Sequence, residues 1–130
     1  MHLLLDTHMW LWMVNSPEKF SPTARRHILK EENELVLSAV STWEIAIKYS
    51  LKKLPLPEHP DEFVPRLLAT TRVSPMAIQV RHTLRVAELP RHHSDPFDRL
   101  LIAQAQLESL SILTVDKQFR QYDVNIVWAH

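Results

Sequence analysis

The chain has 130 residues, with 15 basic and 15 acidic side chains and no cysteine. Without cysteine, disulfides, thiolate metal sites and cysteine nucleophiles are excluded. Glycine is also absent, and the phosphate loops that bind ATP, GTP or NAD need glycine where the backbone approaches phosphate. The formal net charge is zero, so any contact with nucleic acid must depend on local charge.

The length suits a single domain, and we expect residues 1–130 to share one core. No apolar run approaches the ~18 residues that span a bilayer. Asp6 and His8 interrupt the apolar N-terminus, and no basic segment precedes it, so we expect no signal peptide and no membrane contact. A cytoplasmic location is the expectation.

The first half of the chain alternates short apolar runs with helical patterns. Residues 2–5 indicate a buried strand, and 7–14 predict a short helix. A second helix is predicted over 21–32, where serine and then proline stand at the start. A strand over 34–39 and a helix over 41–53 follow.

The alternation continues through the middle of the chain. Residues 60–71 predict a helix, although Pro65 is expected to kink it or delay its start. Residues 73–76 indicate a brief strand. Helices are predicted over 77–89 and 95–110.

The last segments predict a strand over 111–115, a helical turn over 116–122 and a strand over 124–129. Short apolar strands that alternate with helices are typical of a parallel sheet covered on both faces. The predicted fold is therefore α/β, a three-layer α/β/α sandwich with a central parallel sheet. In such sheets, functional sites form at the carboxyl ends of the strands.

Four acidic residues fall at this predicted edge. Asp6 follows the first strand, Glu44 lies in the first turn after the second, Asp98 begins a helix, and Asp116 follows 111–115. We expect the four carboxylates to converge, and crowded carboxylates raise one another's pKa unless a cation relieves the repulsion. Oxygen ligands without cysteine suit Mg²⁺ or Mn²⁺.

Each acid also has a purely structural explanation. In "STWE", Ser41 and Glu44 have the spacing of a capping box. Asp95, which precedes a proline, is well suited to cap the helix over 95–110. The other three can be explained as helix caps or partners of a helix dipole: Asp6, Asp98 and Asp116.

Six motifs carry a family resemblance: "LLLDTHMWLW", "LSAVSTWEIAIK", "LPLP", "HHSDPFDRLLIAQA", "SILTVD" and "VNIVWA". On these motifs the chain resembles the PIN-domain ribonucleases, specifically the VapC-type toxins of bacterial and archaeal toxin–antitoxin pairs. The resemblance extends over essentially the whole chain. It implies a PIN-like fold and a metal-dependent endoribonuclease.

The resemblance also implies a set of site residues. Asp98 matches a metal-site aspartate of the family, whereas Asp95 matches a flanking position that we assign to capping. Thr7 and Thr114 are expected to orient the carboxylates by hydrogen bonding. The expected catalytic and metal-binding acids, of which the last is the most variable in the family, are Asp6, Glu44, Asp98 and Asp116. With Mg²⁺ or Mn²⁺, they would cleave RNA to 3′-hydroxyl and 5′-phosphate ends.

RNA binding requires positive charge beside the acidic edge. Trp10 and Trp43 are candidates for base stacking, although their helical spacing favours the core or an interface. The basic side chains in question, which are otherwise ordinary surface charges, are Arg91, His92, His93, Arg99 and Lys117.

The resemblance further implies a VapB-like antitoxin and a homodimer. Helices that contain "HMWLWMV" and "ARRHILKE" offer a groove for an antitoxin segment, with the core as the alternative position of their apolar residues. The residues expected in the groove are Trp10, Leu11 and Val14. The dimer is expected to use 44–51 and 77–89.

The sequence departs from the family where relatives commonly carry glycine, near Lys52 and Asp123. This departure affects turn geometry rather than the site. We expect turns with positive φ to use Asn33, Asp123 or Asn125.

Two other functions remain open at this stage. A metal-free ribonuclease would rely on paired histidines for acid–base catalysis, with His8, His92 and His93 as candidates. A PIN fold that has lost catalysis would serve only as a binding module, but all four acids are present.

Overall fold

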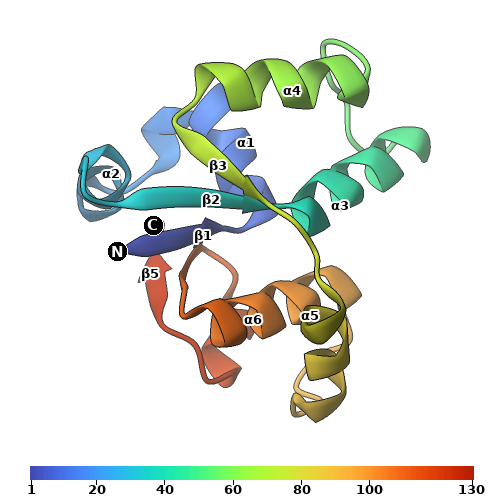
Figure 1. The fold of residues 1–130 in the computed structure, drawn as a ribbon. Coiled ribbons are helices and arrows are strands. Elements are labelled where there is room, and N and C mark those ends of the chain that lie inside the picture. Colours follow the sequence, from blue (N-terminus) through green and yellow to red (C-terminus); the bar gives the residue numbers. More distant parts are fainter.

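Five parallel strands form the centre of the molecule, in the order β3-β2-β1-β4-β5 (Figure 1). This is a computed structural model, and it describes all 130 residues. The strands are β1 (His2–Leu5), β2 (Glu34–Ser38), β3 (Val73–Met76), β4 (Ser111–Thr114) and β5 (Ile126–Trp128). The predicted parallel sheet is confirmed.

Helices cover both faces of this sheet, as Figure 1 shows. One face carries α1 (Thr7–Asn15), α2 (Pro22–Leu29) and α4 (Pro60–Thr70), and the other carries α5 (Val80–Arg85) and α6 (Pro96–Glu108). α3 (Ala39–Ser50) contacts α1, α4 and α6. Short 3₁₀ turns are η1 (Pro17–Lys19), η2 (Val86–Glu88) and η3 (Lys117–Gln121). No helix has the length and apolar character that crossing a membrane requires.

Alternation along β1 divides the core in two. Leu3 and Leu5 pack on the face of α1 and α4, whereas Leu4 packs on the face of α6. Successive side chains of a strand point to opposite faces, so an unbroken apolar run marks a strand buried on both sides. The three-layer α/β/α sandwich predicted from the sequence is therefore confirmed.

The start of α3 differs from the prediction in a way that matters for the site. Ser38, not Ser41, is the N-cap, because its hydroxyl accepts from the Val40 N–H at 3.0 Å. The same hydroxyl donates to Gln104 on α6 at 2.6 Å. Glu44 therefore lies in the second turn of the helix, and the predicted capping box is wrong.

Two other helices are shorter than predicted. α2 ends at Leu29 because the Asn33 side chain donates to the His27 carbonyl and closes the helix. The helix predicted over 77–89 is confined to α5 and η2. In α4, by contrast, Pro65 lies inside a helix that already begins at Pro60, so its expected delay of the start is wrong.

Positive φ falls on residues other than the asparagines and aspartate that were expected to adopt it. Lys52 has φ 59° and Ser109 has φ 56°, and no other residue has positive φ. The expected Asn33, Asp123 and Asn125 are therefore wrong. A left-handed conformation costs a residue with a Cβ roughly 1–2 kcal/mol. The turn after α3, where family members commonly have glycine, keeps its shape at that cost.

Candidate active site

The carboxyl edge of the sheet gathers the predicted acids. Asp6 directly follows β1, Glu44 faces it from α3, Asp98 lies in the first turn of α6, and Asp116 follows β4. Charges of the other three, and of Asp95, contribute to the raised pKa of Asp98. The four carboxylates therefore lie within electrostatic reach of one another, although they are separated by up to 110 residues of sequence.

Asp6 is held in the centre of this edge by β4. Its Oδ2 accepts a hydrogen bond from the Thr114 hydroxyl at 2.8 Å, and its side chain caps no helix. Burial raises the pKa of Asp6, while the Thr114 hydrogen bond opposes the rise. The structural explanation of Asp6 as a cap is therefore wrong, and Thr114 has the orienting contact expected of it.

Glu44 is buried and has two partners. The Thr7 hydroxyl lies 2.7 Å from its Oε1, and Lys48 donates to its Oε2. Burial lowers the pKa of Lys48, but the hydrogen bond and charge of Glu44 outweigh it, so the pKa is raised overall. Sequence reasoning missed Lys48, although its i,i+4 spacing from Glu44 was a usable signal.

Asp95 and Asp98 have different roles at the start of α6. Asp95 Oδ1 accepts from the N–H groups of Phe97 and Asp98, at 2.9 and 3.1 Å, and so caps the helix. Asp98 faces His93, with 3.2 Å between Oδ2 and Nε2. Burial, followed by the charge of Asp95, raises the pKa of Asp98 to about 8.

Asp116 is half-buried at the start of η3. Its Oδ1 accepts from the Gln118 N–H at 2.9 Å and caps η3. Its own N–H donates to Thr114 Oγ1 at 3.0 Å. The structural explanation of Asp116 as a cap is thus confirmed, and one carboxylate oxygen is left for other contacts.

The donor atoms at this edge are carboxylate oxygens, with one imidazole nearby. No three or more of the acidic or histidine side chains are grouped tightly enough to hold an ion. Instead, Glu44 is turned to Lys48, Asp6 to Thr114 and Asp98 to His93. The chemistry fits a hard divalent cation, because crowded carboxylates and no sulfur ligand favour Mg²⁺ or Mn²⁺.

The prediction that Arg99 contacts RNA is wrong, because the residue is buried. Its side chain is only 6% exposed. The guanidinium donates to the carbonyls of Pro90 and Leu89 and to the Tyr122 hydroxyl. Arg99 therefore fastens the loop before α6 to the domain and is unavailable to RNA.

Of the other basic side chains predicted to contact RNA, all but His93 are exposed. Arg91, His92 and Lys117 are exposed, and His93 is half-buried. Trp43, the residue before Glu44, is 52% exposed and meets Phe97 edge-to-face at 5.1 Å. Phe97 in turn precedes Asp98. An aromatic pair, in which Trp43 is exposed and Phe97 is half-buried, thus flanks two of the acids.

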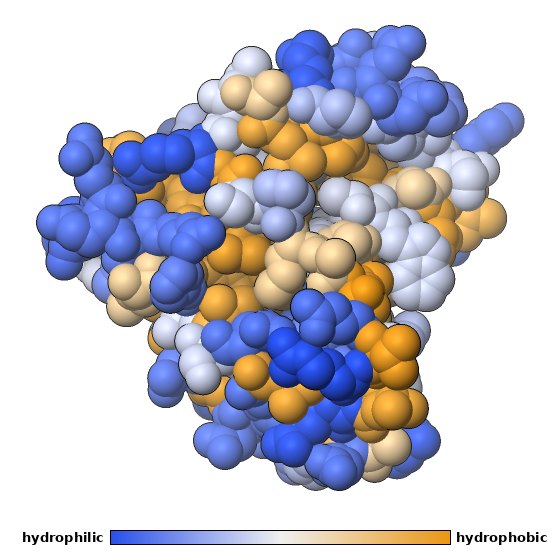
Figure 2. Space-filling model, in the orientation of Figure 1, coloured by the Kyte–Doolittle hydropathy of each residue, from blue (hydrophilic) through white to orange (hydrophobic).

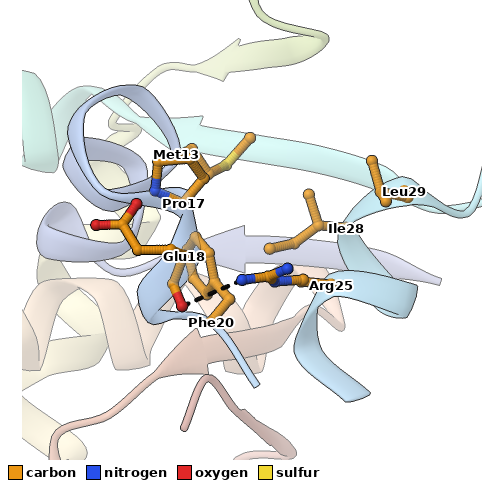
Figure 3. Close-up of a pocket in the computed structure, with 7 residues that line it drawn as sticks. All are labelled: Met13, Pro17, Glu18, Phe20, Arg25, Ile28 and Leu29. Atoms are coloured by element: carbon orange, nitrogen blue, oxygen red, sulfur yellow. Dashed lines mark hydrogen bonds between the residues drawn. The ribbon is translucent and has the colours of Figure 1, made fainter. Parts of the chain in front are cut away.

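The prediction that Trp10 lies in an antitoxin groove is wrong, because the residue belongs to the core. It is fully buried against Phe63, whereas Leu11 and Val14 are half-buried on the same core. An open pocket of about 470 Å³ lies nearby, between α1, η1 and α2 (Figure 3). Its lining, mostly apolar, consists of Met13, Pro17, Glu18, Phe20, Arg25, Ile28 and Leu29.

The sheet order and the acidic edge define an α/β protein with a carboxylate site at the carboxyl ends of its strands. A family model for the PIN domain matches residues 3–125, and the chain belongs to this family. Over 45 residues it is 47% identical to Ribonuclease VapC16 of Mycobacterium tuberculosis. That segment covers 35% of this chain and about a third, 32%, of the relative.

Solved structures agree with this family. The chain is similar to VapBC2 of Rickettsia felis bound to promoter DNA, with TM-score 0.74, 16% identity and full coverage of both chains. It is also similar to DNA-bound VapBC of Salmonella typhimurium, with TM-score 0.73, 19% identity and coverage of 100% and 99%. At these identities the likeness concerns the fold, and the predicted PIN-like fold is confirmed.

Proposed function

We propose that this protein is a Mg²⁺- or Mn²⁺-dependent endoribonuclease of the VapC toxin type. The observation that carries the proposal is the crowding of four carboxylates at one edge. Burial, followed by the charges of the neighbouring acids, raises the pKa of Asp98 to about 8. A site of this kind is electrostatically unfavourable unless a cation joins it. The relative named as a ribonuclease supports RNA as the substrate.

The chain's own residues have distinct roles in this proposal. Asp6 and Asp98 bind the cation, with Glu44 and Asp116 beside them or acting through water. Thr114 and Thr7 hold the carboxylates of Asp6 and Glu44 in place. Lys48 neutralises Glu44, and a bound cation would compete with it for that carboxylate.

When bound, the cation activates water and shields the negative charge of the phosphodiester. The remaining contribution of the protein is geometry and electrostatics. In-line attack then leaves 3′-hydroxyl and 5′-phosphate ends. A cyclic 2′,3′-phosphate product would instead indicate the metal-free histidine mechanism.

RNA would approach along the exposed side of the site. Arg91 and Lys117 supply positive charge there, His92 offers a hydrogen-bonding imidazole, and Trp43 offers a face for an unpaired base. Trp43→Ala should weaken cleavage roughly 5- to 150-fold, which corresponds to a stacking contribution of about 1–3 kcal/mol. Leu51→Ala, a change of an exposed apolar residue at the end of the same helix, should leave cleavage unchanged.

A VapB-like antitoxin is the proposed protein partner. The apolar pocket between α1 and α2 suits one side of an amphipathic helix, and the solved relatives are VapBC pairs. Ile28→Glu, on the pocket wall, should prevent neutralisation while RNA cleavage persists. Neutralisation of this variant would rule the pocket out as the antitoxin site.

A homodimer is proposed through α5. Val80 and Leu84 are 75% and 67% exposed, one helical turn apart, and Figure 2 shows apolar surface over this helix. Leu84→Glu should convert a dimer to a monomer in multi-angle light scattering. A dimer that persists would place the interface elsewhere.

The decisive experiment is cleavage of total RNA by purified protein with Mg²⁺, Mn²⁺ or EDTA, beside Asp6→Asn. The expected result is metal-dependent cleavage that Asp6→Asn abolishes, with 5′-phosphate ends. Cleavage that survives EDTA would support the histidine mechanism. If protein that mass spectrometry shows to be free of antitoxin cleaves no RNA with either metal, the result would support a binding module.

A further inference from the structure

The contacts around Tyr122 determine which nitrogen of His93 carries its proton. The Tyr122 hydroxyl oxygen faces three nitrogens: Arg99 Nη1 at 3.1 Å, the His93 backbone N at 3.3 Å and His93 Nδ1 at 2.7 Å. The first two can only donate. They occupy the acceptor positions of the hydroxyl, so its own proton has one remaining partner, His93 Nδ1.

Because Nδ1 accepts this proton, the neutral ring carries its hydrogen on Nε2. Nε2 lies 3.2 Å from Asp98 Oδ2. We infer that Arg99, Tyr122 and His93 form a relay of hydrogen bonds that fixes the imidazole as an Nε2–H donor and thereby positions the Asp98 carboxylate for cation binding. The inference rests on the proposed function of the site, and it makes His93 a positioning residue rather than a contact for RNA.

Burial gives the relay its rigidity. Tyr122 and Arg99 are buried, and Arg99 also holds the carbonyls of Val86, Leu89 and Pro90. The His93 side chain is 12% exposed and also packs against the Tyr122 ring. Neighbouring His92 is exposed. With Oδ2 held by His93, the other oxygen of Asp98 makes no hydrogen bond within the chain.

Two substitutions of His93 separate the two ends of its ring. In His93→Gln, the side-chain amide can donate to Asp98 as Nε2 does. In His93→Asn, the shorter side chain reaches only the position of Nδ1. It keeps the hydrogen bond to Tyr122 and loses the one to Asp98. Both remove the imidazole, so a loss of packing affects them equally. His92→Asn, on the exposed neighbour, is the control.

The metal alone is the first probe. Free Mn²⁺ counted by electron paramagnetic resonance gives the affinity of the full chain without any need for cleavage. We expect His93→Asn to weaken Mn²⁺ binding by roughly 10- to 100-fold, and His93→Gln and His92→Asn to stay within about 3-fold of wild type. Equal affinities of the Asn and Gln variants of His93 would overturn the positioning role.

The tautomer itself is the second probe. Long-range ¹H–¹⁵N correlation spectra of the wild type should show His93 with a bare Nδ1 and a protonated Nε2, and Tyr122→Phe should yield a mixture of tautomers. A wild-type ring protonated on Nδ1 would overturn the inference. If wild type binds no Mn²⁺, the proposed function fails, and the spectra alone then decide the state of His93.

Discussion

The two ends of α6 carry the same pair of groups with opposite electrostatic results. At the start, His93 Nε2 faces the Asp98 carboxylate at 3.2 Å, and at the end, His82 Nε2 faces Glu108 at 2.9 Å. His82 Nδ1 accepts from the Gln79 N–H, so its Nε2 is also the donor. Nevertheless, the pKa of Asp98 is raised to about 8, whereas the pKa of Glu108 is lowered by its hydrogen bond to His82.

The helix dipole predicts the reverse of this pattern. It favours an anion at the start of a helix and disfavours one at the end, but its effect of about 0.3–1 kcal/mol is less than one pKa unit. Burial and neighbouring charge decide instead. Asp98 is enclosed among Asp95, Asp6, Asp116 and Glu44, while Glu108 is partly exposed and paired with Arg81. Glu108 forms an ion pair with an arginine, whereas Asp98 forms none with a lysine or an arginine.

The largest expected difference between the two ends is in activity. Asp98→Asn should lower RNA cleavage by on the order of 10³-fold, because it removes a ligand of the charge that stabilises the transition state. Glu108→Gln, the matched change at the other end, should leave cleavage within about 2-fold. Initial rates on one RNA at saturating Mg²⁺ measure both. Similar losses in the two variants would mean that stability, not chemistry, limits the rate.

The second difference is the pH dependence of stability. Between about pH 4 and 8 folded Asp98 keeps a proton that the unfolded chain releases, so its contribution to stability falls as pH rises through this window. The Asp98→Asn variant has no proton to release at this position, so its stability should not fall in this way as pH rises. At pH 8.5 its Tm should exceed that of wild type by at least roughly 4 °C, the change that about 1 kcal/mol produces in a domain of this size.

Calorimetry across the pH range gives the control for this effect. The two melting temperatures should converge below about pH 3, where Asp98 is protonated in both states. Addition of Mg²⁺ at pH 8.5 should raise the Tm of wild type more than that of Asp98→Asn. A variant that is less stable than wild type at every pH would show that Asp98 is a structural residue.

The sequence predicted the fold and the acidic edge because both follow from local patterns. Runs such as "LLL" before Asp6 mark strands buried on two faces, and parallel strands bring their carboxyl ends to one edge. The capping box was wrong because "SAVSTWE" offers two serines, and a tertiary contact of Ser38 with Gln104 favours the first. The hydrogen bond to Gln104, 66 residues beyond Ser38, thus determines where α3 begins and so which turn of the helix contains Glu44.

Residues whose partners are distant in sequence could not be assigned. Arg99 belongs to the interior only because Tyr122 and the loop carbonyls before α6 surround it. Trp10 lies on the apolar side of a short helix, and the spacing of apolar residues along that helix is the same whether this side faces a groove or the core. In both cases the side chain's environment is set by packing between elements, which a single sequence does not encode locally.

The third difference is smaller and concerns the stabilising end. The folded pKa of Glu108 is lowered, so its ionised form stabilises the fold above its ordinary pKa, and this contribution is lost as pH falls through the folded value. Glu108→Gln keeps the acceptor for His82 but loses the charge beside Arg81. It should cost about 1 kcal/mol at pH 7 and nothing once the wild-type carboxyl is protonated. Urea unfolding at pH 7 and in acid tests this, and a cost that persists in acid would indicate lost packing instead.

The smallest expected effect separates burial from charge at the start of α6. Asp95 is the neighbour that contributes most to the raised pKa of Asp98, and it is also the helix cap. Asp95→Asn keeps a capping side chain of the same shape and removes only the charge. The pKa of Asp98, measured by carbon-13 NMR of its carboxyl group, should fall below 8 by less than about one unit, while the free energy of unfolding changes little. A pKa that stays unchanged would mean that burial alone perturbs Asp98, and the contrast with Glu108 would then be one of exposure rather than of neighbouring charge.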